Sequence, residues 1–509
     1  MAREPSLLLL PADRPRISQL IFFVLGCVTT LAFAPFELSI LVPLVLVPFL
    51  YVCLTNSPRD SAKHGFWLGF GMFLTGTYWI YISVAIFGQA PTWIALLLMI
   101  GLVLLMSVYL WITGWLISRL ASGEPWLLLV VAPAIWVIVE WARGWLITGF
   151  PWMSLGYSQV DSALAGWAPL IGVYGVSALM VLFSAAILVA IMTRGRQQMI
   201  AIGLVLLPGL VGAGLRAVDW TEPDGEPLTA TIIQGGISQD KKWLIEQFQP
   251  TLDFYRNETR KAAGSDIVVW PEVAIPAASD RVEGYILGLE SDSRINEQTI
   301  LFGILERVTE RTIKPKTYNA IIAVNGEERQ AYRKRHLVPF GEYFPVPATV
   351  REWMRMMSLP HSDLTAGDEP PPLIHTLGGV ELAVAICYED AYGAEQLYAM
   401  PEAGILINVS NDAWFGGSIA AHQHLEIARM RSLEVGRHTI RATNTGVSAF
   451  IGPKGEVLET GEQFVPVTMT RSVQPYKGAT PYSSVGNGLV LGLAFLIVGG
   501  FWLGGRVNL

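Results

Sequence analysis

Apolar positions form long runs near both ends of the chain and short runs in the middle. Residues 17–215 contain few charged positions, and residues 487–505 form one more apolar run, whereas residues 220–480 contain most of the Lys, Arg, Asp and Glu. A helix that crosses a bilayer needs roughly 20 mostly apolar residues. The pattern therefore predicts a multi-pass α-helical membrane bundle, a water-soluble domain and a closing transmembrane helix. We place them at residues 1–219, 220–482 and 483–509.

Eight apolar segments are candidates for membrane spans. The first two are short and closely spaced, so they depart most from the expected length. The segments are 17–35, 39–54, 65–86, 91–118, 125–142, 166–192, 198–215 and 487–505.

The first of these segments also has features of a cleavable signal peptide. Basic residues precede its apolar run, and the run ends in Ala32-Phe33-Ala34, which has the small residues of a cleavage site. However, Pro35 and a further apolar run follow directly, so we favour an uncleaved membrane anchor.

Positive charge lies mainly on one set of loops. Because basic loops stay in the cytoplasm, this asymmetry predicts cytoplasmic termini and places residues 220–480 on the opposite side of the membrane. The opposite loops carry little positive charge beyond Arg143. The residues on the basic side are Arg3, Arg14, Arg16, Arg59, Lys63, Arg119, Arg194, Arg196 and Arg506.

Aromatic residues are dense in the loop from Trp141 to Tyr157, on the side opposite to the basic loops. This density is typical of an aromatic belt at the membrane interface. It also fits the floor of a lipid-binding cleft that faces the soluble domain. The sequence leaves both interpretations open.

The soluble domain alternates short β-rich runs with helical runs, which is an α/β pattern. Two sheets covered by helices would suit the number of strands, and the pattern does not exclude a single doubly wound sheet. The expected strands are 228–234, 266–270, 299–305, 317–324, 328–332, 381–386, 405–409, 439–442 and 448–451. The expected helices are 242–262, 281–291, 391–400 and 422–436.

Composition argues against nucleic-acid binding. Apolar residues make up 52% of the chain and the net charge is −7, with no basic cluster interleaved with aromatics, so nucleic acid is not an expected partner. The chain has three cysteines, and Cys27 and Cys53 lie in apolar spans. Cys387 is the single cysteine of the soluble domain, so it is either a buried inert thiol or a reactive one.

Three residues of different chemistry lie at or just after predicted strands. Glu272 follows 266–270, Lys334 follows 328–332 and Cys387 follows 381–386. Ligands bind at strand ends in α/β folds. A thiol that precedes a helix and lies near a lysine is expected to have a lowered pKa. The three residues indicate nucleophilic catalysis with a base and a cation.

Neither a metal site nor a cofactor is expected. His422 and His424 are two residues apart, and no carboxylate–histidine cluster has the spacing of metal ligands. A glycine-rich phosphate loop after a strand is also missing from the sequence.

The motifs around these residues resemble those of the nitrilase (carbon–nitrogen hydrolase) superfamily. They are Trp270-Pro271-Glu272, Lys334 with His336-Leu337-Val338-Pro339-Phe340-Gly341-Glu342, Cys387-Tyr388-Glu389, and Asn411-Asp412-Ala413-Trp414-Phe415-Gly416. The resemblance implies an αββα sandwich.

The resemblance also implies roles for single residues. Glu272 would be the general base, Lys334 the oxyanion stabiliser and Cys387 the nucleophile. Trp243 matches a family tryptophan near the substrate, with a core residue on a helix face as the alternative. The supporting residues would be Glu342, Tyr388 and Glu389.

With its membrane spans, the whole chain resembles a family of bacterial inner-membrane N-acyltransferases that modify apolipoproteins. That likeness implies a phospholipid acyl donor, a Cys387 thioester, and the N-terminal amine of a diacylglyceryl-cysteine as acceptor, on the periplasmic side. The apolar residues in 340–357 would form a membrane-facing arm, or else ordinary packing under a loop. Alternatives are a membrane-tethered amidase and a transporter with an inactive domain, although the few ionisable residues in the spans argue against an ion pathway.

Overall fold

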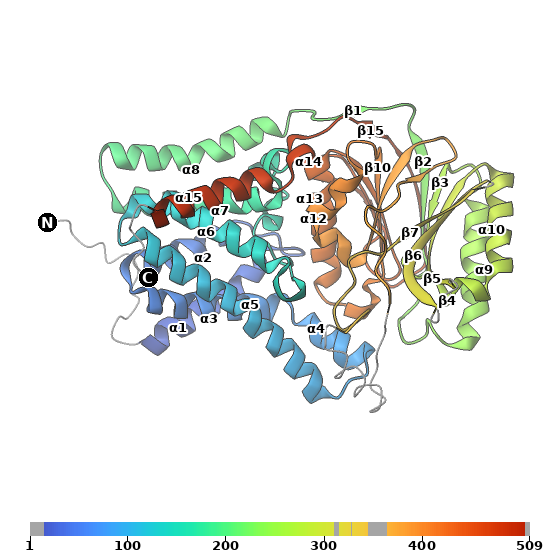
Figure 1. Ribbon diagram of the computed structural model, residues 1–509, viewed down its shortest axis with the longest axis horizontal. Helices are drawn as coiled ribbons and strands as arrows, with labels where there is room; N and C mark the ends of the chain where they lie inside the picture. Colours follow the sequence, from blue (N-terminus) through green and yellow to red (C-terminus); the bar gives the residue numbers. More distant parts are fainter. Residues whose placement is uncertain (1–14, 310–314, 327, 345–363, 504–509) are drawn as a thin grey trace. The chain divides into compact units, whose positions relative to one another are not determined.

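The computed structural model describes residues 15–309, 315–326, 328–344 and 364–503 (Figure 1), and it divides into two compact units. The first unit runs to Asp219 and includes Gly417–Glu426 and the segment from Val485 onward. The second consists of Trp220–Gly416 and Ile427–Ser484. Each unit has its own core, so each is described separately.

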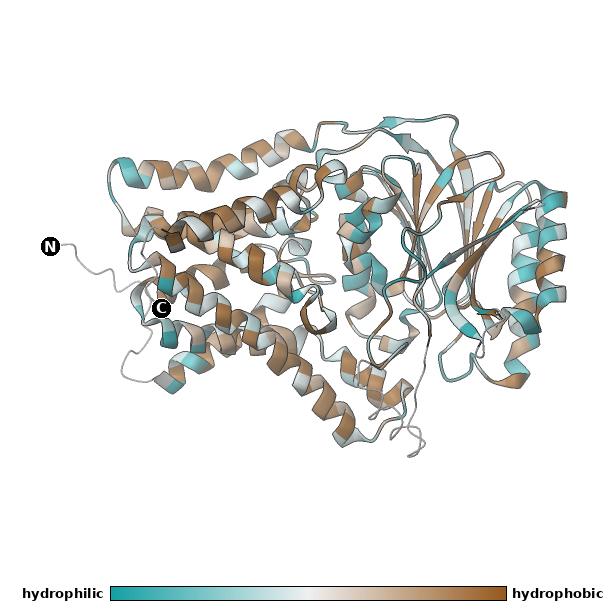
Figure 2. Cartoon of the chain, in the orientation of Figure 1, coloured by the Kyte–Doolittle hydropathy of each residue, from teal (hydrophilic) through white to brown (hydrophobic). Residues whose placement is uncertain are grey.

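The first unit is made of apolar helices, which are predominantly brown in Figure 2. Helix α3 has the most extensive packing, against α1 and α5. Small residues permit the close approach, since a Cβ at Gly65 or Gly26 would collide with backbone atoms of a neighbouring helix. The helices are α1 (Pro15–Thr29), α2 (Leu41–Thr55), α3 (Pro58–Gly76), α4 (Trp79–Tyr81), α5 (Thr92–Ala121), α6 (Pro125–Arg143), α7 (Ala168–Met192), α8 (Arg196–Leu215) and α15 (Gly488–Leu503).

Four helices of the described chain are long and apolar enough to cross a membrane, or five if the bent pair Pro58–Gly76 and Trp79–Phe87 is one span. The prediction of eight spans is therefore too high. Three of the predicted segments form helices shorter than the roughly 20 residues of a span, at Arg16–Ala32, Leu41–Thr55 and Gly488–Phe501. The predicted span 65–86 is interrupted by a 50° bend.

One sheet of the second unit has the strand order β14-β2-β3-β5-β6-β7, with β4 paired to β5. Strands β2, β3 and β5 are parallel. Strand β6 runs antiparallel to β5, and β7 runs antiparallel to β6, so β7 has the same direction as β3. The strands are β2 (Leu228–Gln234), β3 (Ile267–Val269), β4 (Ile275–Ala278), β5 (Thr299–Val308), β6 (Lys316–Asn325), β7 (Glu328–Arg333) and β14 (Val467–Val473).

The other large sheet has the order β13-β12-β11-β10-β9-β8. Its strands β9, β10 and β11 are parallel, and β10 pairs with β11 over its whole length and with β9 over Ile405–Val409. The strands are β8 (Ile374–His375), β9 (Glu381–Ile386), β10 (Ile405–Ser410), β11 (His438–Thr443), β12 (Ala449–Ile451) and β13 (Val457–Thr460). A short pair, β1 (Glu222–Pro223) with β15 (Tyr476–Lys477), forms a separate ladder.

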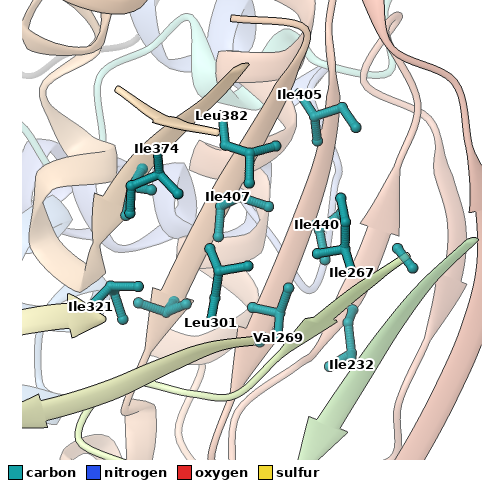
Figure 3. Packing of buried hydrophobic residues seen from close by; sticks show 14 of the residues in the cluster. Ile232, Ile267, Val269, Leu301, Ile321, Ile374, Leu382, Ile405, Ile407 and Ile440 are labelled. Carbon is teal, nitrogen blue, oxygen red and sulfur yellow. The ribbon is translucent and has the colours of Figure 1, made fainter. Parts of the chain in front are cut away.

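The two sheets pack face to face over an apolar core, in which Ile232 and Val269 of one sheet meet Ile407 and Ile440 of the other (Figure 3). Helices α9 (Ile245–Lys261) and α10 (Glu283–Asn296) cover the outer face of the first sheet. The outer face of the second sheet packs against the 3₁₀ turn Leu397–Ala399 and the end of α13 (Ala420–Val435). The second unit is thus a layered α/β domain.

One predicted helix of this domain is wrong in extent. The segment 391–400 forms only the four-residue helix α12 (Gly393–Gln396), followed by a 3₁₀ turn. Gly393 at its start and Pro401 just after the turn both work against a longer helix.

Candidate active site

Glu272 lies in a tight turn directly after the buried strand β3. Pro271 ends the strand, because proline has no N–H to donate to the ladder. The Glu272 carboxylate is buried and accepts hydrogen bonds from the side-chain amide of Asn319 at 2.7 Å and from the backbone N–H of Asn411 at 2.8 Å. This end of the sheet therefore holds a buried carboxylate with fixed hydrogen-bond partners.

Lys334 follows β7 and lies at the same end of the sheet as Glu272, because β7 and β3 run in the same direction and both residues follow the carboxyl end of a strand. Its ammonium is almost fully buried and lies 3.5 Å from the Glu272 carboxylate and 2.9 Å from that of Glu342. The Asn319 amide donates to both carboxylates, at 2.7 and 2.8 Å. The four side chains form one connected network.

The charge state of Lys334 follows from this network. Burial works to lower the pKa of its ammonium, but the negative charges of Glu342 and Glu272 outweigh that effect and raise the pKa. Lys334 is therefore a permanent cation. A buried cation of this kind can meet the negative charge that develops on a carbonyl oxygen.

Cys387 begins the turn after β9, and its backbone is left-handed, with φ of 52°. This conformation costs energy for a residue other than glycine and is found at functional sites. The thiol is half-buried and bonds to the Ser410 hydroxyl. Because β9 and β10 are parallel neighbours, Cys387 and Asn411 both lie at the carboxyl ends of their strands, on one end of the sheet. The Asn411 N–H in turn donates to the Glu272 carboxylate, so the end of β10 contacts Cys387 through Ser410 and Glu272 through Asn411.

The pKa of the Cys387 thiol shifts in the direction opposite to the expected one. Burial raises the pKa of the thiol above its ordinary value, the negative charge of Glu272 raises it further, and Lys334 opposes both. The expected lowering of the pKa is therefore wrong, because desolvation outweighs the lysine. The resting residue is a protonated thiol, so it needs a base within reach to become a nucleophile.

Glu389 stabilises the turn that begins at Cys387. One carboxylate oxygen accepts the N–H of Ile386 at 2.7 Å and the hydroxyl of Tyr332 at 3.0 Å. The other accepts the N–H of Arg335 at 2.7 Å and of His336 at 3.2 Å. The same side chain thus joins the Cys387 turn to the segment that carries Lys334, which fits a supporting role.

The two predicted aromatic residues lie in different surroundings. Tyr388 is buried, and its ring packs edge-on against His336, with centroids 5.8 Å apart. Trp243 lies just before α9 with 53% of its surface exposed, so the alternative of a helix-face core residue is wrong. The described contacts do not connect Trp243 directly to Glu272, Lys334 or Cys387.

Sequence reasoning missed three contributors to the site. Asn319 lies in a predicted strand, where its lone amide among apolar residues was an available signal. Asn411 belongs to a motif whose residues the sequence analysis gives no role, and its backbone N–H donates a hydrogen bond to the Glu272 carboxylate. Lys242 was hidden in a predicted helix beside Lys241, and its ammonium bonds the Glu272 carbonyl.

Gly303 of β5 packs against the turn that carries Glu272, and a Cβ there would lie 2.3 Å from the Val273 nitrogen. We expect Gly303→Ala to displace Glu272 and to lower the rate of the reaction at this site by roughly a hundredfold, the cost of an ångström-scale shift. Steady-state kinetics would measure the effect. Gly284→Ala is the matched control, since nothing lies near its Cβ. Equal rates for the two variants would contradict the expectation.

The proposed arm at 340–357 lies mostly outside the described residues. Within the described part, Phe340 is 52% exposed and stacks edge-on against Phe344. Its backbone is left-handed, with φ of 63°. The remaining residues of that segment, from 345 onward, are not described.

Two family models match the chain, one to each unit. An apolipoprotein N-acyltransferase N-terminal domain matches residues 25–186, and a carbon–nitrogen hydrolase domain matches residues 229–481. An amidase from Nesterenkonia sp. aligns with 52% of this chain and 96% of its own, at 14% identity and a TM-score of 0.36.

Curated relatives match nearly the full length. Apolipoprotein N-acyltransferase of Nitrosomonas europaea is 38% identical over 94% of this chain and 95% of its own. The enzymes of the same name from Methylococcus capsulatus and Azotobacter vinelandii are 37% and 39% identical, over 93% of this chain in both cases and 94% and 92% of their own. Both units therefore have counterparts in each of these relatives.

Proposed function

The chain belongs to the apolipoprotein N-acyltransferase family, and we propose that it uses Glu272, Lys334 and Cys387 to move a fatty acyl chain from a phospholipid to a lipoprotein amine. The observation that carries the proposal is the buried network of Glu272, Lys334 and Glu342 beside a protonated thiol. A base, a fixed cation and a nucleophile are the groups that covalent acyl transfer requires.

The first half-reaction forms a thioester. Glu272 accepts the proton of the Cys387 thiol as the sulfur attacks the ester carbonyl carbon of the phospholipid. The negative oxygen of the tetrahedral intermediate faces the Lys334 ammonium and the backbone N–H of Tyr388. When the carbon–oxygen bond breaks, Glu272 returns the proton to the leaving lysophospholipid, and the acyl chain stays on the sulfur.

The second half-reaction forms an amide. The N-terminal amine of a diacylglyceryl-cysteine attacks the thioester, Glu272 takes a proton from it, and the sulfur leaves and regains a proton. The two substrates react in turn, which gives ping-pong kinetics. Glu342 supports Lys334, Glu389 supports the nucleophile turn, and Trp243 contacts the substrate.

The membrane helices suit these substrates. Moving an acyl chain out of a bilayer costs ~0.8 kcal/mol per CH₂, so an enzyme held at the bilayer avoids most of that cost. The distribution of basic residues among the loops supports cytoplasmic termini and a catalytic domain on the periplasmic side of the inner membrane. We assign residues 1–219 and 483–509 to the membrane part and 220–482 to the catalytic domain.

The proposal is tested by separating the two half-reactions. The full-length enzyme in detergent is incubated with a phospholipid that carries a labelled acyl chain, and the protein is analysed by mass spectrometry. We expect label on Cys387 that hydroxylamine removes. Addition of a diacylated lipopeptide with a free N-terminus should then move the label to the peptide amine.

A membrane-tethered amidase is the competing function, and the same experiment distinguishes it. A hydrolase would release the labelled chain as free fatty acid and leave the lipopeptide amine unmodified. That result would overturn the proposed acyl transfer. A label that never reaches Cys387 would overturn the thioester.

A further inference from the structure

A second buried lysine lies beside the base, and the steps above do not use it. Lys242 has only 3% of its surface exposed. Its ammonium donates a hydrogen bond of 3.3 Å to the main-chain carbonyl of Glu272. The segment that carries it precedes α9, and its backbone is anchored by a bond from the Lys242 N–H to the Ser238 carbonyl. Lys242 therefore contacts the peptide of the base rather than its carboxylate.

The turn that Lys242 contacts is strained. Val273, directly after Glu272, has φ of 48°, which is a left-handed conformation that a β-branched residue rarely adopts. Such a conformation persists only where its surroundings hold it in place. The Ala274 N–H bonds the Pro271 carbonyl at 3.2 Å, Gly303 packs closely behind the turn, and Lys242 bonds its carbonyl.

The negative charge of Glu272 helps to keep the buried Lys242 side chain charged. Burial lowers the pKa of the Lys242 ammonium to about 8, and the negative charge of Glu272 opposes that shift. The side chain is thus mainly charged at neutral pH. An apolar residue would fill the same space without the cost of a buried charge. Lys242 and Lys334 approach Glu272 at different groups, the main-chain carbonyl and the carboxylate.

We propose that Lys242 is a positioning residue for the general base, which holds the strained Pro271–Val273 turn and thereby keeps the Glu272 carboxylate within reach of the Cys387 thiol. This inference rests on the proposed role of Glu272. Because Glu272 moves a proton in both half-reactions, the loss of Lys242 should slow both to a similar extent. Substrate affinity should not change, because Lys242 contacts Glu272 and not the substrate.

The test compares Lys242→Met, Lys242→Arg and Lys241→Met in the full-length enzyme. Methionine keeps the length of the stem and removes the donor and the charge, whereas arginine keeps both. Lys241 is the matched control, since it is the adjacent lysine and is exposed. The readouts are the single-turnover rates of Cys387 acylation and of transfer to the lipopeptide, the fraction of Cys387 that becomes acylated, and KM.

We expect Lys242→Met to lower both single-turnover rates by roughly ten- to hundredfold, with the full fraction of Cys387 still acylated and KM unchanged. Lys242→Arg should recover part of the rate, and Lys241→Met should match the unmodified enzyme. A reduced acylated fraction with a normal rate per active site would mean that Lys242 only supports folding, and it would overturn the proposal. Single-turnover rates of Lys242→Met equal to those of Lys241→Met would also overturn the proposal.

A parallel Glu272→Gln variant tests the role of Glu272 as general base separately from the positioning role of Lys242. If Glu272→Gln is slow and Lys242→Met is not, the role of Lys242 fails and the base remains. If Glu272→Gln retains both rates, the assignment of the base itself fails, and the positioning role fails with it.

Discussion

Replacement of Cys387 by serine should reduce acyl transfer by roughly 10⁴- to 10⁶-fold, the range expected when a covalent nucleophile is removed. The sulfur begins the left-handed turn after β9, and the surrounding base and cation are arranged around that one position. A serine hydroxyl has a far higher pKa than a thiol, so Glu272 would not activate it comparably. No labelled acyl chain should remain on the Cys387→Ser protein after incubation with phospholipid.

Cys27 supplies the control for this prediction. It is also half-buried and outside any disulfide of the described chain, but it lies in helix α1 of the other unit. Cys27→Ser should therefore retain acyl transfer and should still carry label at Cys387. If the Cys387→Ser variant acylated the lipopeptide at a rate near that of Cys27→Ser, the thioester mechanism would be wrong.

The central strands of the catalytic domain could be predicted because their pattern is unambiguous. Residues 382–386 form a continuous apolar run, as strands buried on both faces do, and 228–234 combines apolar residues with β-branched threonines. The two segments form β9 and β2 with the predicted bounds. Strand β14 was missed. It is an edge strand that pairs only with β2, and three of its seven residues are exposed. Its signal is the alternation of apolar and polar residues over Val467–Val473, not the apolar run that marks the central strands.

The membrane helices show the limit of hydropathy as a predictor. The segment 39–54 is apolar enough for a span, but the helix it forms, Leu41–Thr55, has 15 residues. The segment 65–86 is also apolar, yet its helix breaks between Gly76 and Trp79, with a bend of 50°. Hydropathy records composition, whereas the length and direction of a helix depend on its caps and tertiary packing.

The positions of the proposed catalytic residues after strands could be predicted, but the environment of their side chains could not. Glu272, Lys334 and Cys387 each follow a strand, and this is visible in the sequence. Their desolvation is not visible there, because it depends on contacts between distant segments such as Asn319 with Glu272 and Ser410 with Cys387. The sign of the thiol pKa shift was therefore wrong, and the contacts of Lys242 were missed.

Glu272→Gln should have opposite effects on two reactions of the same thiol. Acyl transfer should fall by roughly 10²- to 10⁴-fold, because a positioned general base is lost. Simple alkylation of Cys387 by iodoacetamide should instead become faster at pH 8. The negative charge of Glu272 is one of the causes that raise the pKa of the thiol, and its removal leaves the opposing charge of Lys334 in place. A lower pKa means more thiolate at a fixed pH, and the thiolate is the species that alkylates.

The sign of this pH effect decides between two roles for the carboxylate. In the unmodified enzyme, alkylation should be slower at pH 8 than that of a free cysteine, and it should rise with pH over a range above the ordinary thiol pKa. In Glu272→Gln the same profile should shift to lower pH. A general base accounts for slower transfer together with faster alkylation. A group that only stabilises the thiolate would, on removal, slow both reactions, and that result would exclude the assigned role of Glu272.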